Sequence, residues 1–161
     1  MIHPIAKISL CGLLFISLLT GCQSNDVPCD GTPVTTKAPD AEVTALKQYI
    51  TSNNIQATAD PRGFYYRIQS PGTGEKPTVC SNVTVNYVGK LTNGQQFDSS
   101  NGISFGLGEL VVGWQEGIPL IAPGGKVTLY LPPSLAYGAR ELPGIPANSI
   151  LVFDIDLVKI N

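Results

Sequence analysis

Two segments of the chain alternate apolar and polar residues one by one, and this pattern limits the possible folds more than any other feature. In the first segment, one face carries Val83, Val85, Tyr87, Gly89 and Leu91. In the second, one face carries Leu151, Phe153, Ile155 and Leu157, whereas Asp154 and Asp156 lie on the other. A period of two is that of a β-strand with one buried and one solvated face. We therefore expect an antiparallel sheet with one wet face.

Composition and shorter patterns predict the rest of this sheet. The chain has 17 Gly and 13 Pro among 161 residues, which favours turn-rich β structure over a helical bundle. Further strands are expected at 64–69, from Phe97 and Asp98, at 103–107 and at 126–131. One short helix at 112–120 carries Trp114, and the long loop 132–149 is of the kind that is usually functional. The predicted fold class is α+β, with five or six strands wrapped over this helix.

A second helix is expected before the sheet, at about residues 41–52, with Asp40 as its N-cap. Val43, Leu46 and Ile50 fall on one side of it and form an apolar stripe. The stripe predicts an amphipathic helix that packs on its own domain. A dimerisation arm or a client-binding arm is the alternative.

The N-terminus resembles the export signal of a bacterial lipoprotein. Lys7 precedes an apolar run at 8–19, which is shorter than the roughly 20 residues that a membrane-spanning helix needs. The run ends in Leu-Thr-Gly before Cys22, as in the lipobox, where this Cys is acylated and becomes the new N-terminus. We expect a signal peptide at 1–21 and a lipidated tether at 22–39, whereas an ordinary signal peptide with an incidental Cys is the alternative.

The same resemblance implies a location. Gln23 rather than Asp follows the lipidated Cys, which favours the outer membrane of a bacterial cell envelope, with the domain outside the cytoplasm.

Composition excludes several classes of function. The formal net charge is −2, without a basic stripe, so no nucleic-acid partner is expected. The only histidine, His3, lies in the predicted signal peptide. The mature chain would therefore have no His for a Ser–His–Asp or Cys–His mechanism or for a His-containing zinc site, and we expect no metal.

Five fragments occur in an order and spacing that resemble one family. They are VTVNYVGKL at 83–91, GQQFDSS at 94–100, GWQEG at 113–117, LAYG at 135–138 and IPANSILVFDIDL at 145–157. Together they resemble the FKBP-type peptidyl-prolyl cis/trans isomerases over residues 64–161, and residues 40–63 resemble the lead-in of bacterial lipoprotein members. The resemblance implies an antiparallel five- to six-stranded half-barrel around one short helix.

The resemblance also implies a substrate pocket. Its catalytic residues would be Tyr87, Phe97, Asp98, Tyr137 and Phe153, and its substrate-binding residues would be Leu110, Val111, Trp114 and Ile145. Trp114 would form the floor, and the Val111 N–H and the Tyr137 hydroxyl would hold peptide carbonyls. The chain departs from the family at two places, in the short segment 99–102 after Asp98 and at Ile103. The segment contains no basic residue, which leaves Asp98 to rely on Tyr137, and Ile103 replaces an aromatic residue, which predicts a shallower pocket.

The activity that the resemblance implies is isomerisation of X–Pro bonds in exported polypeptides. The barrier is the loss of amide resonance, so the reaction needs no acid, base, metal or cofactor. A non-catalytic peptide-binding chaperone module and a structural lipoprotein with a vestigial pocket are the alternatives. We expect a monomer attached to the membrane only through the lipid on Cys22.

Two further cysteines, Cys29 and Cys80, would also be exported to an oxidising compartment. We expect a disulfide between them that pins the tether to the domain, which the chain-entropy model values at roughly 4 kcal/mol. Two unpaired thiols, or an intermolecular bridge through Cys29, are the alternatives.

Overall fold

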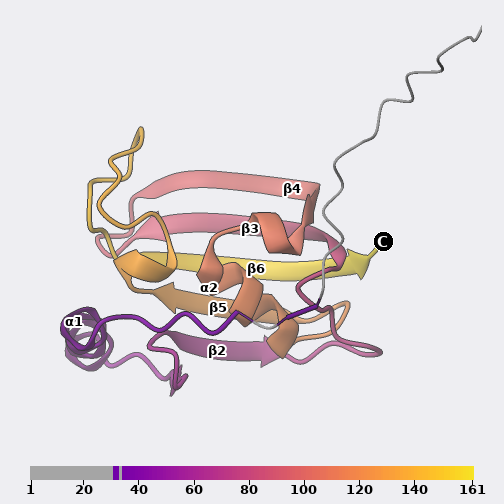
Figure 1. The fold of residues 1–161 in the computed structure, drawn as a ribbon, viewed down its shortest axis with the longest axis horizontal. Coiled ribbons are helices and arrows are strands. Elements are labelled where there is room, and N and C mark those ends of the chain that lie inside the picture. The colour runs from indigo at the N-terminus through magenta and orange to yellow at the C-terminus, as the bar shows by residue number, and fades with distance from the viewer. Residues whose placement is uncertain (1–30, 33) are drawn as a thin grey trace, which may run out of the picture.

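The structure is a computed structural model and describes residues 31–32 and 34–161. Its six-stranded sheet is antiparallel throughout, in the order β1-β2-β5-β6-β3-β4 (Figure 1). The strands are β1 (Thr58–Ala59), β2 (Tyr65–Ser70), β3 (Asn82–Leu91), β4 (Gln96–Gly106), β5 (Lys126–Leu131) and β6 (Leu151–Ile160). The helices are α1 (Asp40–Ser52), α2 (Val112–Gly117) and the 3₁₀ turns η1 (Leu107–Glu109), η2 (Ile118–Leu120) and η3 (Pro133–Leu135). The predicted α+β class, with an antiparallel sheet and a short helix, is confirmed.

The alternation in β6 matches its burial. Leu151, Phe153, Ile155 and Leu157 are buried on one face. The other face carries cross-strand polar contacts, in which Asp154 accepts hydrogen bonds from Lys90 of β3 (3.0 Å) and from Thr128 of β5 (2.7 Å). In β3, Val83 and Val85 are buried on the apolar face, and Thr84 between them is buried as well. Its hydroxyl is hydrogen-bonded to Ser104 and Asn161. The sheet therefore has one apolar face and one largely polar face, as the period of two predicts.

Helix α2 packs closely on the apolar face of the sheet (Figure 1). A Cβ at Gly113 would lie 2.4 Å from a Leu131 methyl carbon, and one at Gly117 would lie 2.5 Å from a Leu129 methyl carbon. Only glycine permits this approach, and the two glycines, four residues apart, lie on one face of the helix. The close contact places Trp114 above the sheet.

Helix α1 packs on the opposite face. Leu46 and Ile50 are buried against Tyr130 of β5, whose side chain points away from Leu129 and Leu131. The expectation that the apolar stripe packs on its own domain is therefore supported by the structure. The expected N-cap, Asp40, is instead the first helical residue, and Pro39 occupies the N-cap position. No side chain makes a capping hydrogen bond at this end of the helix.

Two elements differ in extent from those predicted, and one strand is additional. The segments expected as two strands, one from Phe97 and one at 103–107, form the single strand β4, because a register shift beside Asn101-Gly102 absorbs the irregular residues. The helix expected at 112–120 is α-helical only to Gly117 and continues as the 3₁₀ turn η2, which contains Pro119. The two-residue strand β1 was not expected, and it exists only through its pairing with β2.

Several predictions concern residues outside those that the structure describes. These are the signal peptide 1–21, the lipidation site Cys22, most of the tether 22–39, and Cys29. At the end of the tether, Ala38 is buried and its N–H donates to the Arg62 carbonyl (2.9 Å). Cys80 is exposed in the turn before β3 and is disulfide-bonded. Within the described part of the chain, no helix has the length and apolar character to cross a membrane.

Candidate active site

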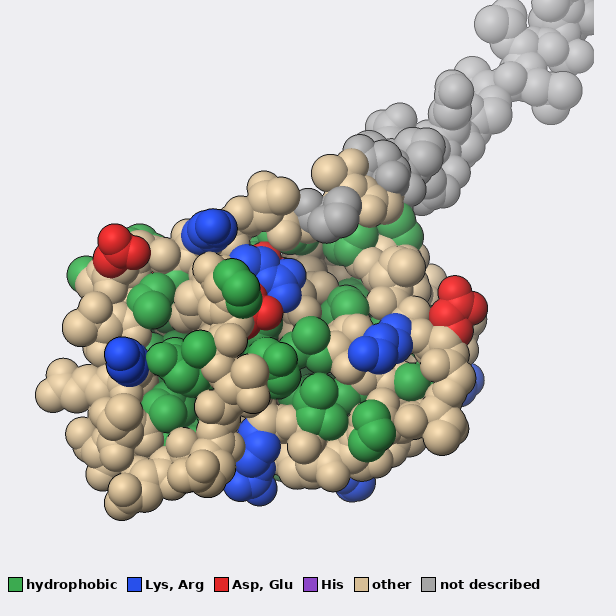
Figure 2. All heavy atoms as spheres, turned by 90° about the horizontal axis from the view of Figure 1, so that it is seen from below, with side chains coloured by type: hydrophobic (Ala, Val, Ile, Leu, Met, Phe, Trp, Pro, Cys, Tyr) green, Lys and Arg blue, Asp and Glu red, His purple; other side chains and the backbone are tan. Residues whose placement is uncertain are grey.

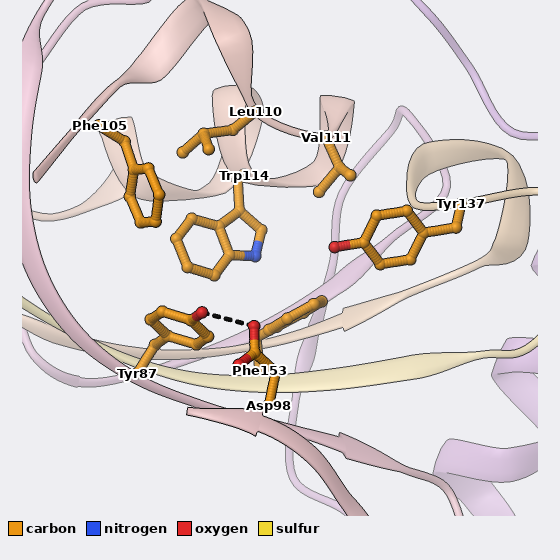
Figure 3. A pocket seen from close by; sticks show the side chains of 8 residues that line it. All are labelled: Tyr87, Asp98, Phe105, Leu110, Val111, Trp114, Tyr137 and Phe153. Carbon is orange, nitrogen blue, oxygen red and sulfur yellow. Dashed lines mark hydrogen bonds between the residues drawn. The ribbon is translucent and has the colours of Figure 1, made fainter. Parts of the chain in front are cut away.

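A cavity of about 210 Å³ opens between α2, the sheet and the loop after η3. It is lined by Tyr87, Asp98, Phe105, Leu110, Val111, Trp114, Tyr137 and Phe153 (Figure 3). Seven of these eight residues, all except Phe105, are among those that the sequence predicted. They come from β3, β4, the segment before α2, α2 itself, the loop after η3, and β6, so the fold alone brings them together.

Trp114 lies at the centre of an aromatic cluster. Its ring is nearly perpendicular to those of Tyr87 (centroids 5.1 Å apart), Phe153 (5.3 Å) and Phe105 (6.2 Å). Edge-to-face contacts of this kind stabilise aromatic pairs beyond simple area burial. Trp114 is only 4% exposed, so the indole forms the floor of the cavity and the other rings form its walls (Figure 3).

The polar side-chain groups of the cavity are two phenols, one carboxylate and the indole N–H of Trp114, which is buried without a hydrogen-bond partner among the described residues. The Tyr87 hydroxyl donates a 2.6 Å hydrogen bond to Asp98 Oδ2, and the Ser99 N–H donates to Asp98 Oδ1 (2.8 Å). The expectation that Asp98 relies on Tyr137 is therefore wrong: its hydrogen-bond partner is Tyr87 on the neighbouring strand β3 (Figure 3). The Tyr137 hydroxyl points into the cavity and makes no hydrogen bond within the described residues.

Both phenols stay protonated at neutral pH. Burial, followed by the hydrogen bond to Asp98, raises the pKa of Tyr87 far above its usual value. Burial, followed by the Asp98 charge, also raises the pKa of Tyr137. The Tyr137 hydroxyl is therefore a neutral hydrogen-bond donor that faces the cavity.

The segment before α2 is fixed by one side chain. Gln115 Nε2 donates to the carbonyls of Leu110 (2.6 Å) and Gly108 (3.1 Å). The Val111 carbonyl accepts the first helical hydrogen bond of α2 from the Trp114 N–H (2.9 Å). Leu110 and Val111 are thereby held at the rim of the cavity (Figure 3).

Two predicted residues do not line this cavity. Phe97 lies behind Phe153, with the ring centroids 5.6 Å apart, in space that Gly89 leaves open. Ile145 is buried in the loop, where it pairs with Leu142 and lines a separate shallow hollow. Phe97 therefore supports the wall that Phe153 forms, rather than forming that wall itself.

Phe105 lines the cavity, although the sequence did not single it out. Ile103 and Phe105 lie on one face of β4, and the β3–β4 register places Phe105 opposite Val83. Phe105 contributes an aromatic wall to the cavity, whereas Ile103 does not line it, and the expectation of a shallower pocket at Ile103 stays a prediction. The signal that could have revealed Phe105 is the period of two from Ile103.

The described residues contain no group of three or more His, Cys, Asp or Glu side chains placed to hold a metal ion.

A family model described as FKBP-type peptidyl-prolyl cis-trans isomerase matches residues 73–158, just over half of the chain. The solved structure of a peptidyl-prolyl cis-trans isomerase from Pseudomonas syringae pv. tomato is 30% identical, with a TM-score of 0.66, and the match covers 78% of this chain and 98% of that one. The chain belongs to the FKBP-type isomerase family. This membership accounts for the joint presence of the aromatic floor, walls and rim in one cavity.

Other FKBP-type relatives are named FkpA. The FkpA of Escherichia coli K12 is 44% identical over 102 residues, which is 61% of this chain and 38% of the relative. The FkpA of Buchnera aphidicola from Acyrthosiphon pisum is 39% identical over 119 residues, which is 71% of this chain and 48% of the relative. The crystal structure of E. coli FkpA gives a TM-score of 0.68 and 37% identity, over 75% of this chain and 60% of that one. The chain thus spans less than half the length of these curated relatives.

Proposed function

We propose that this chain is a peptidyl-prolyl cis/trans isomerase that acts on X–Pro segments of exported polypeptides and assists their folding. The observation that carries the proposal is the cavity in which Tyr87, Phe105 and Phe153 surround the buried ring of Trp114. A proline ring is apolar, and a cavity of about 210 Å³ suits a group of that size. Family membership supports the same activity.

The mechanism needs only binding. Uncatalysed X–Pro isomerisation takes tens to hundreds of seconds because twisting the bond sacrifices amide resonance, a barrier of about 20 kcal/mol. The twisted amide has less charge separation than the planar one, so an apolar cavity favours it. This differential stabilisation lowers the barrier, and a 10⁴-fold acceleration needs only about 5.5 kcal/mol.

The polar groups of the cavity orient the peptide. The Tyr137 hydroxyl and the Val111 N–H would donate to carbonyls of the bound peptide, and this would hold one part of the peptide while the bond rotates. Both residues line the cavity, which supports these roles. Asp98, held by Tyr87, would lie near the carbonyl of the rotating bond. Phe97 supports Phe153 from behind, and Ile145 holds the loop that carries Tyr137.

The test is the cis-to-trans conversion of X–Pro tetrapeptides by the purified protein, with a preference for an apolar residue before proline. A rate equal to the uncatalysed one would contradict the proposal. Suppression of client aggregation without any acceleration would instead support the non-catalytic chaperone module.

The sequence of the N-terminus supports a lipid-anchored periplasmic location. Lipidation of Cys22 would attach a monomer to the outer membrane, with the isomerase domain outside the cytoplasm. Cys22→Ser should release the protein from membranes or leave an uncleaved precursor. Unchanged membrane association and unchanged electrophoretic mobility would contradict lipidation, and a dimer in detergent by light scattering would contradict the monomer.

A disulfide between Cys29 and Cys80 belongs to the same proposal. The disulfide-bonded state of Cys80, and its exposed place before β3, support this pairing. It would leave residues 22–28 as a short leash to the membrane. Alkylation of the exported protein should label neither thiol before reduction and both after it, and a peptide map should recover the linked pair. Labelling without reductant would contradict the pairing.

A further inference from the structure

A buried carboxylate lies on the side of α2 away from the cavity. Glu116 is 3% exposed, and neither of its carboxylate oxygens has a hydrogen-bond partner within the described residues. The nearest cation is Arg62, whose Nε lies 3.6 Å from Glu116 Oε2. Burial of a charge is costly unless a partner offsets it, and for Glu116 the contact with Arg62 offsets only part of that cost.

Arg62 is itself held firmly. Its Nε and Nη2 donate to the two carboxylate oxygens of Asp60 (2.8 and 2.9 Å), and its backbone N–H donates to Asp60 Oδ1 (2.9 Å). The guanidinium also lies over the ring of Phe64, 5.3 Å from its centroid, and Phe64 is fully buried. A bidentate pair on an aromatic face fixes an arginine more strictly than a single ion pair does. Arg62 therefore presents a rigid positive charge to α2.

The geometry of α2 links this charge to the cavity. Residues two apart on a helix point in nearly opposite directions, so Trp114 and Glu116 project from opposite sides. Between them, Gly113 and Gly117 face β5. The helix has only six residues, so contacts on its two sides determine its rotation about its own axis. A rotation that separated Glu116 from Arg62 would also tilt the Trp114 ring.

We propose that Arg62 is a positioning residue of the isomerase site, which acts through Glu116 to set the orientation of α2 and of its Trp114 ring. The family model matches residues 73–158, which include every residue of the cavity. Asp60 and Arg62 precede this segment, so in this proposal the lead-in before the isomerase domain helps to shape the site. The catalytic consequence rests on the proposed isomerase function. The orientation of the Trp114 ring can be measured whether or not the protein has isomerase activity.

The pair should respond to pH. Burial raises the pKa of Glu116 to about 7, with Arg62 opposing the shift and Asp60 adding to it. Within the described residues, Arg62 is the charged group that shares the pocket around Glu116, and Asp60 is bound to Arg62. Tyr87, Asp98 and Tyr137 face the other side of α2, in the cavity. The Arg62–Glu116 ion pair is therefore complete above neutral pH and is weakened below it.

The first experiment follows the fluorescence of Trp114, the one tryptophan of the chain, in the full-length protein between about pH 5 and about pH 9. In the wild type we expect a transition near pH 7. Because Arg62 lowers the pKa of Glu116, Arg62→Met should move the midpoint upward, and Glu116→Gln should abolish the transition. Asp98→Asn should leave the midpoint in place, as should Arg67→Met, which removes an exposed arginine of β2.

The second experiment measures kcat and KM above pH 8 in the same variants. Arg62→Met should lower kcat/KM by about tenfold, because a small displacement of the pocket floor has a large kinetic effect. The Arg62→Met/Glu116→Gln double variant should be no worse than Glu116→Gln alone, since the two changes remove one interaction. If Arg62→Met does not fold, Arg62→Lys keeps the charge but loses the bidentate contact with Asp60, and a smaller upward shift of the midpoint is expected.

Two outcomes would overturn the proposal: an unchanged fluorescence midpoint in the folded Arg62 variant, or kinetic effects of the two substitutions that simply add. If the wild type does not accelerate X–Pro isomerisation, the proposed function fails, whereas the fluorescence series still decides whether Arg62 positions Trp114.

Discussion

The cavity has few polar side-chain atoms, and most of its lining is aromatic or aliphatic. On the face of the molecule in Figure 2, basic and acidic side chains are scattered among apolar and neutral ones, without a stripe of one sign. Within the cavity, the Asp98 carboxylate is held by Tyr87, and the Tyr137 hydroxyl has no hydrogen-bond partner in the part of the chain that the structure describes. The proposed binding of proline there would depend on the fit of an apolar ring and on a few hydrogen bonds rather than on attraction between charges.

The aromatic wall that Phe105 forms gives a prediction for a single residue. Phe105→Ala should lower kcat/KM between about twofold and about tenfold, because the edge-to-face contact with Trp114 and the apolar wall are lost together. Phe105→Leu should retain more activity, since it keeps an apolar side chain. Tetrapeptide kinetics on both variants checks this, and an unchanged kcat/KM in Phe105→Ala would show that Phe105 does not contact the substrate.

Glu116 gives a prediction for stability against pH. Its folded-state pKa of about 7 lies above the usual 4.5, so the folded protein binds more protons than the unfolded chain between these values. The free energy of unfolding should therefore fall as pH rises through this range, by about 3 kcal/mol from this group. Urea unfolding of Glu116→Gln should lack this fall. A wild-type stability that rises from pH 5 to pH 7 in parallel with the variant would contradict the shift.

Asp60 acts in the opposite direction. Burial raises the pKa of Asp60, but the hydrogen bonds from Arg62 outweigh burial and leave the pKa below its usual value. Its contribution to stability is therefore present above the unfolded-state pKa and is lost in acid. Together, Asp60 and Glu116 therefore favour the folded state most in mildly acidic solution, between the two ranges.

Among the elements, α2 depends most on close packing. Gly117→Ala would place a methyl group 2.5 Å from Leu129, which should destabilise the fold by about 1–3 kcal/mol. The double variant Gly117→Ala/Leu129→Ala should be less destabilised than the sum of the two single changes, because the smaller side chain makes room. Thermal unfolding of the three variants measures this. Strict additivity would mean that the two side chains do not meet.

Helix α1 gives the matching prediction on the other face of the sheet. Leu46 is fully buried against Tyr130, so Leu46→Ala should cost about 2–5 kcal/mol. Lys47→Ala, at the exposed position beside it, should change stability by less than about 0.5 kcal/mol. Equal small effects in denaturant unfolding would indicate that α1 does not belong to the folded unit.

At the scale of the whole molecule, local pattern predicted the elements and missed the contacts between them. The period of two in β6, and the five family fragments, were enough for the sheet, the short helix and most of the cavity. Phe105 depends on the β3–β4 register, the Tyr87–Asp98 bond crosses two strands, and the Arg62–Glu116 contact joins distant segments. Such contacts are set by tertiary packing, which no single stretch of sequence encodes.

The most direct test of the central claim is proline exchange measured by NMR on an X–Pro peptide with a small amount of the protein. We predict exchange cross-peaks between the cis and trans proline signals, together with a peptide-dependent shift of the indole N–H of Trp114, the one tryptophan in the chain. Absence of exchange, or catalysed exchange that leaves the Trp114 signal unmoved at saturating peptide, would contradict the assignment of the reaction to this cavity.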